Sequence, residues 1–300
     1  MKHRSAHFML SLVAFPLMAS SLLPKDLPVV VSDEDWRPLA QSVDKDLQRK
    51  LEERLDKNKL WAFLLKGRKM AVGLVDITQP DSARFARING STMMYAASLP
   101  KIAILLAACQ SFEDGTLQET PEIVNDLNLM IRKSSNQAAT RVIDWLGYER
   151  IEAVLTDPRY KLFDPDEGGG LWVGKRYAKI GKRHPDPLKG LSHAATVDQV
   201  CRFYHLLATG RLVTPQRSRQ MLEILSDPGL HHKFVNVLEE VAPQARLYRK
   251  SGTWKNWHSD SVLVWDTQWR RYILVGMVEH PFGENILKDL VLAIEEVLGH

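Results

Sequence analysis

The residues best suited to chemistry begin with a serine and a lysine three positions apart, Ser98 and Lys101, at the start of an apolar run. Residues three apart on a helix share a face, so the Lys101 amine can reach the Ser98 hydroxyl. A serine is a poor nucleophile near neutral pH unless a neighbouring group takes its proton. Pro100 fits the first turn of a helix, whose N-terminus favours negative charge on an attacked carbonyl oxygen. Taken alone, the spacing is more typical of a solvated helix face.

A second polar group lies between two predicted helical segments. Ser134 offers a hydroxyl that can relay a proton, and Asn136 offers an amide that can hold a substrate carbonyl or the lysine. A helix cap followed by a polar turn is the structural alternative.

A third polar group ends a predicted strand. Gly252 permits close approach of a substrate backbone, and Lys250 provides positive charge beside it. Ser251 and Thr253 provide donors for a carboxylate. An ordinary edge strand with exposed polar residues has the same pattern, so this motif is informative only together with the other two.

In this order, SLPK, SSN and KSGT resemble the signature of class A β-lactamases and other penicillin-recognising serine hydrolases: S-x-x-K, S-D-N or S-x-N, then K-[ST]-G. The runs MAVGLVDI, YAASLPKIAILLAA and AATVDQVCRFYHLLATGRLV also resemble segments of that family. The resemblance implies an α/β (α+β) fold of the β-lactamase/transpeptidase type. Such a fold has an antiparallel sheet flanked by helices and an inserted all-helical lobe.

The resemblance also implies a mechanism, in which Ser98 attacks a strained or peptide-like amide and forms an acyl-enzyme. Lys101 would be base or proton relay, Ser134 would carry a proton to the leaving nitrogen, and Asn136 would orient the substrate. The substrate's carboxylate side would be bound by Lys250, Ser251 and Thr253. The backbone N–H groups of Ser98 and Thr253 would form the oxyanion hole.

Two departures from the family pattern concern Ser135 and Glu167. Ser135 stands where class A enzymes usually have Asp. The loop that carries E-x-x-L-N in class A enzymes, with its deacylating Glu, reads DPDEGGGLW here. Glu167 is the catalytic candidate by rough position, an exposed loop acid is the alternative, and Asp164 and Asp166 compete for the role. We therefore expect fast acylation by penicillins and slow turnover.

Three functions stay open at this point, and they differ in deacylation. The first is a β-lactamase that opens β-lactams. The second is a D-Ala-D-Ala-type peptidase, esterase or amidase with slow β-lactam turnover. The third is a non-enzymatic sensor that stays acylated. The expected substrate is a small β-lactam or a cell-wall peptide, with no cofactor and no metal.

The elements that must position these residues follow from periodicity. Val43, Leu47, Leu51 and Leu55 predict one face of an amphipathic helix. Strands are predicted at residues 70–77, 83–88, 245–250, 261–265 and 272–278, the first two forming a hairpin, and helices at 97–113, 121–133, 137–146, 197–208 and 285–298. The Gly-, Pro- and Lys/Arg-rich stretch 157–193 is too long for an ordinary connection and is predicted to frame the site or to be flexible.

Composition limits the remaining possibilities. The 300 residues carry 40 Lys+Arg against 36 Asp+Glu, and this net charge of +4 is too small to indicate nucleic-acid binding. A basic, then apolar N-terminus predicts a signal peptide over residues 1–24 and a periplasmic or secreted protein. Residues 25–300 would form one catalytic domain and a monomer, with an α/β lobe from 40–96 and 215–300 and a helical lobe from 97–214. The basic loop residues Lys175, Arg176, Lys179, Lys182, Arg183 and Lys189 either attract an anionic polymer or are simply solvated.

Overall fold

A five-stranded antiparallel sheet forms the centre of the computed structural model, which describes residues 26–266 and 269–299. The strand order is β2-β1-β10-β9-β8, so the two ends of the chain supply adjacent strands, as expected. The strands are β1 (Met70–Asp76), β2 (Arg84–Ile88), β8 (Arg246–Trp254), β9 (Trp257–Trp265) and β10 (Arg271–Glu279). The predicted signal peptide, residues 1–24, lies outside the described residues.

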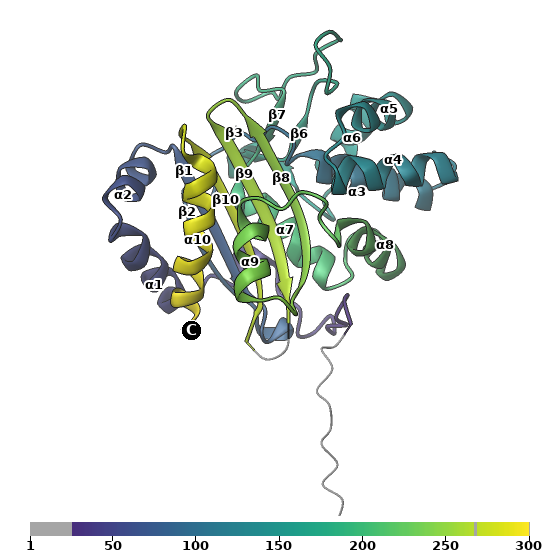
Figure 1. Ribbon diagram of the computed structural model, residues 1–300. Helices are drawn as coiled ribbons and strands as arrows, with labels where there is room; N and C mark the ends of the chain where they lie inside the picture. The colour runs from purple at the N-terminus through teal and green to yellow at the C-terminus, as the bar shows by residue number, and fades with distance from the viewer. Residues whose placement is uncertain (1–25, 267–268, 300) are drawn as a thin grey trace, which may run out of the picture.

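Four helices cover one face of the sheet. They are α1 (Lys45–Asp56), α2 (Lys59–Lys66), α9 (Phe234–Val241) and α10 (Gly283–Leu298), and Figure 1 shows α9 and α10 in front of the strands. The predicted α1 face is confirmed for Leu47, Leu51 and Leu55, which are buried. The prediction is wrong for Val43, which precedes the helix, forms a β-bridge with Phe85 and is 42% exposed.

Helix α7 (Val197–Ala208) packs on the opposite face, against β1 and β10. Gly73 of β1 permits this contact, since a Cβ there would lie 2.6 Å from the Cys201 sulfur of α7. Cys201 and Cys109 are both buried and unpaired. Among the described residues, no helix combines the length and apolarity that crossing a membrane requires.

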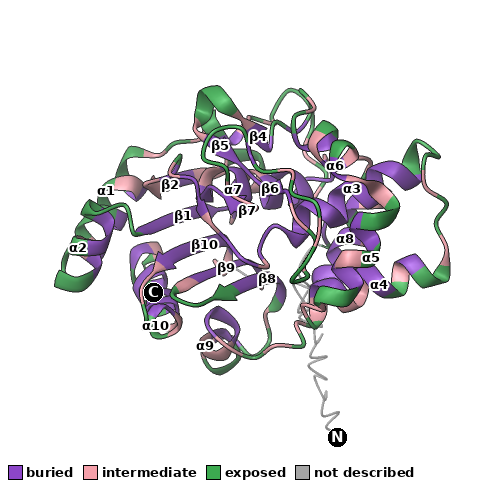
Figure 2. Cartoon of the chain, turned by 90° about the horizontal axis from the view of Figure 1, so that it is seen from above, coloured by how far each residue is buried: buried purple, intermediate pink, exposed green. Residues whose placement is uncertain are grey.

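The remaining helices gather beside the sheet, away from α1 and α2 (Figure 2). They are α3 (Lys101–Glu113), α4 (Pro121–Arg132), α5 (Asn136–Leu146), α6 (Tyr148–Leu155) and α8 (Pro215–Leu225). Helix α3 is the centre of this group, and its residues 101–112 are all buried. The chain has the predicted mixed α/β architecture, while the lobe boundaries at 96/97 and 214/215 stay a prediction.

Two predicted boundaries next to the site are wrong. Helix α3 starts at Lys101 instead of residue 97, because Ala97 has a φ of 50° and cannot continue a helix. Strand β8 runs on past residue 250 to Trp254, because the ladder continues through the pairs Gly252–Ser259 and Thr253–His258. The KSGT motif therefore lies within the strand, not at its end.

The stretch 157–193 frames the site with short pieces of regular structure. It contains β4 (Phe163–Asp164), β5 (Gly169–Gly170), β6 (Trp172–Val173) and the start of β7 (His193–Ala195). Strand β7 pairs with β6 and with β3 (Met94–Tyr95), which leads directly to Ser98. Short 3-10 turns occupy Leu39–Gln41, Pro80–Ser82 and Pro165–Glu167.

Candidate active site

Ser98 lies in the turn that joins β3 to α3. The N–H of Leu99 donates to the Ala96 carbonyl at 3.0 Å and the N–H of Lys101 to the Ser98 carbonyl at 3.3 Å, so the turn leads into the helix. The positive φ of Ala97 separates the strand from this turn. Ser98 is partly buried, and Lys101 follows it by one turn, as the spacing predicts.

Lys101 is completely buried and connects α3 to the segment between α4 and α5. Its Nζ donates to the Ser134 carbonyl at 2.7 Å and to Asn136 Oδ1 at 2.8 Å, and it lies 3.4 Å from Ser134 Oγ. None of its hydrogen bonds in the described chain goes to Ser98 Oγ. Burial lowers the pKa of Lys101 to about 7.

The hydrogen bonds of Lys101 suit a neutral amine. The two short bonds, to the Ser134 carbonyl and to Asn136, match the two N–H donors of an uncharged lysine and leave its lone pair to accept a proton. The ring of Tyr177 lies 4.4 Å from Nζ and stabilises the charged form. Within the described ranges, no carboxylate lies at ion-pair distance from Lys101.

Ser134 and its neighbours have separate tasks. Ser134 has a φ of 53°, and its Oγ accepts from Lys250 Nζ at 3.0 Å, so this hydroxyl lies between two lysines. Ser135 caps α5, accepting from the N–H of Ala138 at 3.2 Å. The cap that the sequence offered as an alternative is thus present, but it belongs to the middle serine and leaves Ser134 available.

Strand β8 brings the third motif against the nucleophile. A Cβ at Gly252 would overlap the Ala96 carbonyl and lie 2.6 Å from the Ser98 nitrogen, so only glycine permits this approach. Lys250 is buried and also donates to the Ser251 carbonyl at 2.7 Å. Burial lowers the pKa of Lys250 well below its ordinary value, and the charge of Lys101 lowers it further. Ser251 is buried, whereas Thr253 is exposed.

A further lysine belongs to this group and was missed in the sequence. Lys233, just before α9, is fully buried, and its Nζ donates to the Gly252 carbonyl at 2.7 Å and to Thr253 Oγ1 at 2.8 Å. The Thr253 hydroxyl accepts from this amine and keeps its own O–H to donate elsewhere. Burial lowers the pKa of Lys233 to about 8. No motif surrounds Lys233 in the sequence, so only the fold reveals this position.

A buried ion pair holds the segment that carries Lys233. Arg249 Nε lies 2.7 Å from Asp260 Oδ1, and the two side chains are 3% and 0% exposed. The other Asp260 oxygen accepts from the N–H of Phe234 at 3.2 Å, and the Arg249 guanidinium donates to the carbonyls of Leu230 and His232. Strands β8 and β9 thereby fix the residues on both sides of Lys233.

Glu167 is the one predicted site residue that the structure does not bring to the others. Its Oε2 accepts from Gln199 Nε2 at 3.1 Å, and it lines a separate cavity of about 350 Å³ with Arg87, Asp198 and Arg202. None of its hydrogen bonds reaches Ser98 or Lys101. Of its two competitors, Asp164 caps the short turn Pro165–Glu167, accepting from the N–H of Asp166 at 3.0 Å, and Asp166 is exposed.

A cavity of about 890 Å³ adjoins the site through Asn136 and Tyr177. The Tyr177 hydroxyl donates to the Ala97 carbonyl at 3.2 Å, next to the nucleophile. Rings contribute much of the wall, and they belong to Tyr95, Tyr177, His193, Trp254 and Trp257. Burial lowers the pKa of His193 to about 4, so this ring is neutral near pH 7. Among the described side chains, no group of three His, Cys, Asp or Glu is placed to hold a metal ion.

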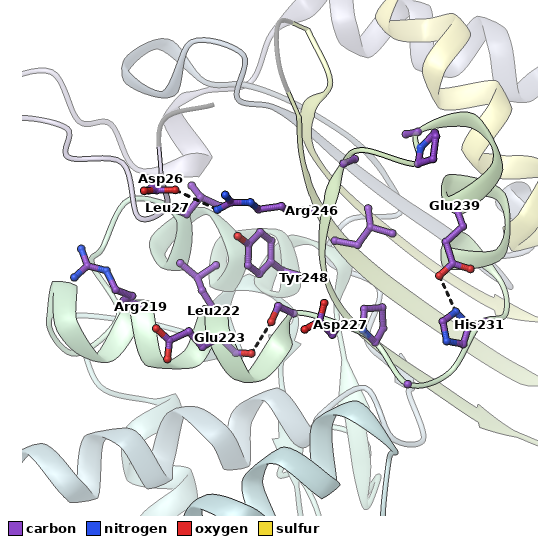
Figure 3. A pocket seen from close by; sticks show the side chains of 17 residues that line it. Asp26, Leu27, Arg219, Leu222, Glu223, Asp227, His231, Glu239, Arg246 and Tyr248 are labelled. Atoms are coloured by element: carbon purple, nitrogen blue, oxygen red, sulfur yellow. Dashed lines mark hydrogen bonds and ion pairs between the residues drawn. The ribbon is translucent and has the colours of Figure 1, made fainter. Parts of the chain in front are cut away.

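A second hollow of about 890 Å³ lies between α8 and the start of β8 (Figure 3). Its charges have both signs, and its contacts include the ion pair Arg246–Asp26 at 3.1 Å and a hydrogen bond between His231 Nδ1 and Glu239 Oε1 at 2.7 Å. Its lining has no lysine that could activate a serine. The first cavity, named here the cavity beside Ser98, is the better candidate for catalysis, because Asn136 and Tyr177 line it and neither lines the second hollow.

Comparison with known proteins identifies a family for this chain. The model of the "Beta-lactamase enzyme family" matches residues 120–295, more than half of the chain. The match includes Ser134, Asn136 and the KSGT motif but begins after Ser98 and Lys101, whose roles stay predictions. No curated protein sequence matches the chain.

Several solved structures share the fold at low sequence identity. A β-lactamase from Sphaerobacter thermophilus has 16% identity and a TM-score of 0.62, covering 84% of this chain and 97% of its own. A class A β-lactamase from Bacteroides cellulosilyticus has 15% identity and a TM-score of 0.62, covering 85% and 99%. The protein PBP-A has 18% identity and a TM-score of 0.59, covering 85% and 97%.

Proposed function

The chain belongs to the β-lactamase enzyme family, and we propose that it is a penicillin-recognising serine hydrolase acylated on Ser98. The observation that carries this proposal is the convergence of Ser98, Lys101, Ser134 and Lys250 from three separate segments. Lys101 and Lys250 both hydrogen-bond to Ser134 Oγ, and Gly252 brings β8 against the Ser98 backbone. This arrangement supplies the groups that nucleophilic attack on an amide needs: a hydroxyl, a base one helical turn away and a proton relay beside the base.

In the proposed acylation step, Ser98 Oγ bonds to the carbonyl carbon of a β-lactam or peptide amide. Its proton goes to the neutral Lys101 amine, and the Tyr177 ring stabilises the resulting ammonium. The C–N bond then breaks, and the leaving nitrogen takes the Ser134 hydroxyl proton, which the Lys101 ammonium replaces. The Thr253 hydroxyl, whose oxygen accepts from the buried Lys233 amine, donates to a carboxylate on the leaving side, and Lys233 supplies positive charge behind it. The product is an ester of Ser98.

We propose that hydrolysis of this ester is slow. A hydrolytic water needs a base within hydrogen-bond reach, and such a base contributes about 10²- to 10⁴-fold. Support comes from two facts: the hydrogen bond of Glu167 goes to Gln199, and in the described chain no carboxylate pairs with Lys101. β-Lactams would therefore accumulate as the acyl-enzyme.

Intact mass spectrometry after mixing with benzylpenicillin tests this proposal. We expect wild type to gain the mass of one penicillin quickly and to lose it slowly, and Ser98→Ala to gain none. Ser91→Ala, at a nearby exposed serine, is the matched control and should label like wild type. Absence of any adduct with penicillins and activated esters would refute the proposal, as would labelling of Ser98→Ala.

The missing base favours a second candidate, a D-Ala-D-Ala-type peptidase or amidase. An amine nucleophile is stronger than water and needs less help from a base, so it would resolve the ester that water resolves slowly. Adding a D-amino acid to the acyl-enzyme of a D-Ala-D-Ala-type peptide should then speed its decay and yield the exchanged peptide. If the acyl-enzyme decays at the same rate with and without the amine, the second candidate is excluded and only the first remains.

For the N-terminus we propose export to the periplasm or beyond, with removal of about the first two dozen residues, as signal peptides of this pattern are removed. The N-terminal sequence of the protein recovered from its native compartment tests this. Full-length protein in the cytosolic fraction would contradict it.

A further inference from the structure

The walls of the cavity beside Ser98 carry charge of one sign only. Its charged lining residues are Lys175, Arg176, Lys179, Arg183 and Lys255, and none of the residues lining it is Asp or Glu. Four come from residues 174–192, named here the basic loop, and Lys255 comes from the β8–β9 turn. These cations are distinct from Lys101, Lys250 and Lys233, which are buried at the reacting end.

Most of these charges lack a carboxylate partner. Arg176 pairs with Asp144 at 2.5 Å. Lys175 donates to the Lys179 carbonyl at 3.3 Å and Arg183 to the Gly190 carbonyl at 3.2 Å, which leaves both charges uncompensated. In the part of the chain that the structure describes, no ion pair includes Lys175, Lys179, Arg183 or Lys255.

The fold holds two of these cations side by side. Lys175 and Arg183 face each other across an antiparallel bridge between the two arms of the basic loop. The base of the loop is fixed by hydrogen bonds from the N–H of His184 to the Gly174 carbonyl at 2.7 Å and from the N–H of Gly174 to the Ser192 carbonyl at 2.6 Å. The positive charges are thus held at the cavity and not carried on a free chain.

The neighbouring surface suits an extended ligand with a flat or apolar body. Trp254 is 57% exposed at the cavity, and Trp257 packs edge-on against Tyr95, with ring centroids 6.2 Å apart. Exposed rings next to uncompensated cations bind a molecule that has both an apolar part and a negative end.

We propose that the substrate of this site carries a second carboxylate, on its acyl side, which the basic loop recognises. This inference deepens the proposed function and rests on it: the leaving-side carboxylate is assigned to the Thr253 hydroxyl, and the loop cations line a cavity that Thr253 does not line. The substrate class is therefore a dianionic acyl compound, such as a peptide or β-lactam with a side-chain carboxylate. Lys175 and Arg183 are the residues that select it.

Two penicillins with the same nucleus test this inference. Carbenicillin differs from benzylpenicillin by one added carboxylate on the side chain. We expect the second-order rate constant for acylation of Ser98 to be on the order of tenfold higher for carbenicillin at low salt, and this ratio to fall at high salt, because screening weakens attraction between exposed charges.

Variants locate the effect on the basic loop. Lys175→Gln with Arg183→Gln should lower the carbenicillin-to-benzylpenicillin ratio to about one, as expected when the attracting charges are removed. Lys182→Gln is the matched control, because Lys182 is an exposed cation of the same loop that does not line the cavity. A carbenicillin-to-benzylpenicillin ratio of about one in wild type would overturn the inference. A fall of this ratio in Lys182→Gln as large as in the double variant would also overturn it.

A non-covalent measurement separates this inference from the acylation chemistry. In Ser98→Ala, quenching of tryptophan fluorescence reports on the cavity through Trp254 and Trp257. Tighter binding of carbenicillin than of benzylpenicillin, lost in the Lys175→Gln, Arg183→Gln background, supports the basic loop even if no penicillin acylates the wild type. Equal binding of carbenicillin and benzylpenicillin to Ser98→Ala overturns the inference. If wild type is also acylated by the two penicillins at equal rates, the proposed function stands and the inference about the basic loop fails.

Discussion

Lys101 sets the chemistry at the scale of single residues. Burial lowers the pKa of its amine to about 7, and only the neutral amine can accept the Ser98 proton. The rate of Ser98 acylation should therefore rise about tenfold per pH unit as the pH increases towards 7, and level off above it. Quenched-flow mass spectrometry across this range measures the profile.

Two outcomes make the Lys101 prediction decisive. Lys101→Ala should lose the pH-dependent rise together with most of the acylation rate. A rate that is flat through pH 7 in wild type, or one that falls as pH increases, would show that Lys101 is not the group that takes the proton.

Glu167 gives a second prediction at the same scale. Its carboxylate hydrogen-bonds to Gln199 and lines a different cavity, so Glu167→Gln should change the decay of the Ser98 acyl-enzyme by less than about twofold. Time-resolved intact mass after removal of free penicillin measures the decay, with Asp166→Asn as the control. A fast wild-type turnover that Glu167→Gln abolishes would instead identify Glu167 as the deacylating base.

At the scale of elements, the basic loop depends on Gly174. A Cβ at residue 174 would overlap the His184 carbonyl. The N–H of the same His184 donates the hydrogen bond to the Gly174 carbonyl that closes the base of the loop. Gly174→Ala should cost about 1–3 kcal/mol of unfolding free energy through overpacking and should slow acylation, because the cavity wall shifts. Urea unfolding and the acylation rate constant measure the two effects.

Gly190→Ala is the control on the same loop. Nothing lies within 4 Å of the added methyl group, although the φ of 68° disfavours a side chain. It should therefore cost less than Gly174→Ala, about 1 kcal/mol. Equal losses in the two variants would mean that the loop base is not held by the contact between Gly174 and His184.

At the scale of the whole molecule, the Arg249–Asp260 pair joins catalysis to fold stability. It links β8, β9 and the segment that positions Lys233, and both side chains are buried. Asp260→Asn leaves the guanidinium buried without its counter-charge, which should cost about 3–5 kcal/mol. Urea unfolding measures this loss, and weaker recognition of the leaving-side carboxylate should accompany it in the fraction that stays folded.

The surface ion pair Arg49–Asp46 is the control for Asp260. Its side chains are 56% and 53% exposed, so Asp46→Asn should change the unfolding free energy little, because solvent screens exposed pairs. Comparable losses in the two variants would show that burial does not set the energy of the Arg249–Asp260 pair.

The sequence by itself determined the elements and the order of the motifs. Hydrophobic periodicity depends only on neighbouring residues, so it predicts single elements well. It predicted α7 at its observed bounds, and it predicted the buried face of α1 through Leu47, Leu51 and Leu55. The motifs SLPK, SSN and KSGT identified Ser98, Lys101, Ser134, Asn136 and Lys250 through Thr253, whose roles stay predictions. The start of α3 was missed because the positive φ of Ala97 has no sequence signal: alanine is a good helix former.

Only the tertiary structure decided what surrounds those motifs. Lys233 reaches Thr253 because the Arg249–Asp260 pair fixes its segment, and no local pattern encodes a contact across 20 residues. Glu167 lies on the predicted loop by its position in the sequence, yet in the folded chain its carboxylate accepts a hydrogen bond from Gln199 of α7. Periodicity reports which face of an element is buried, whereas the direction of a side chain from a loop depends on everything packed around it.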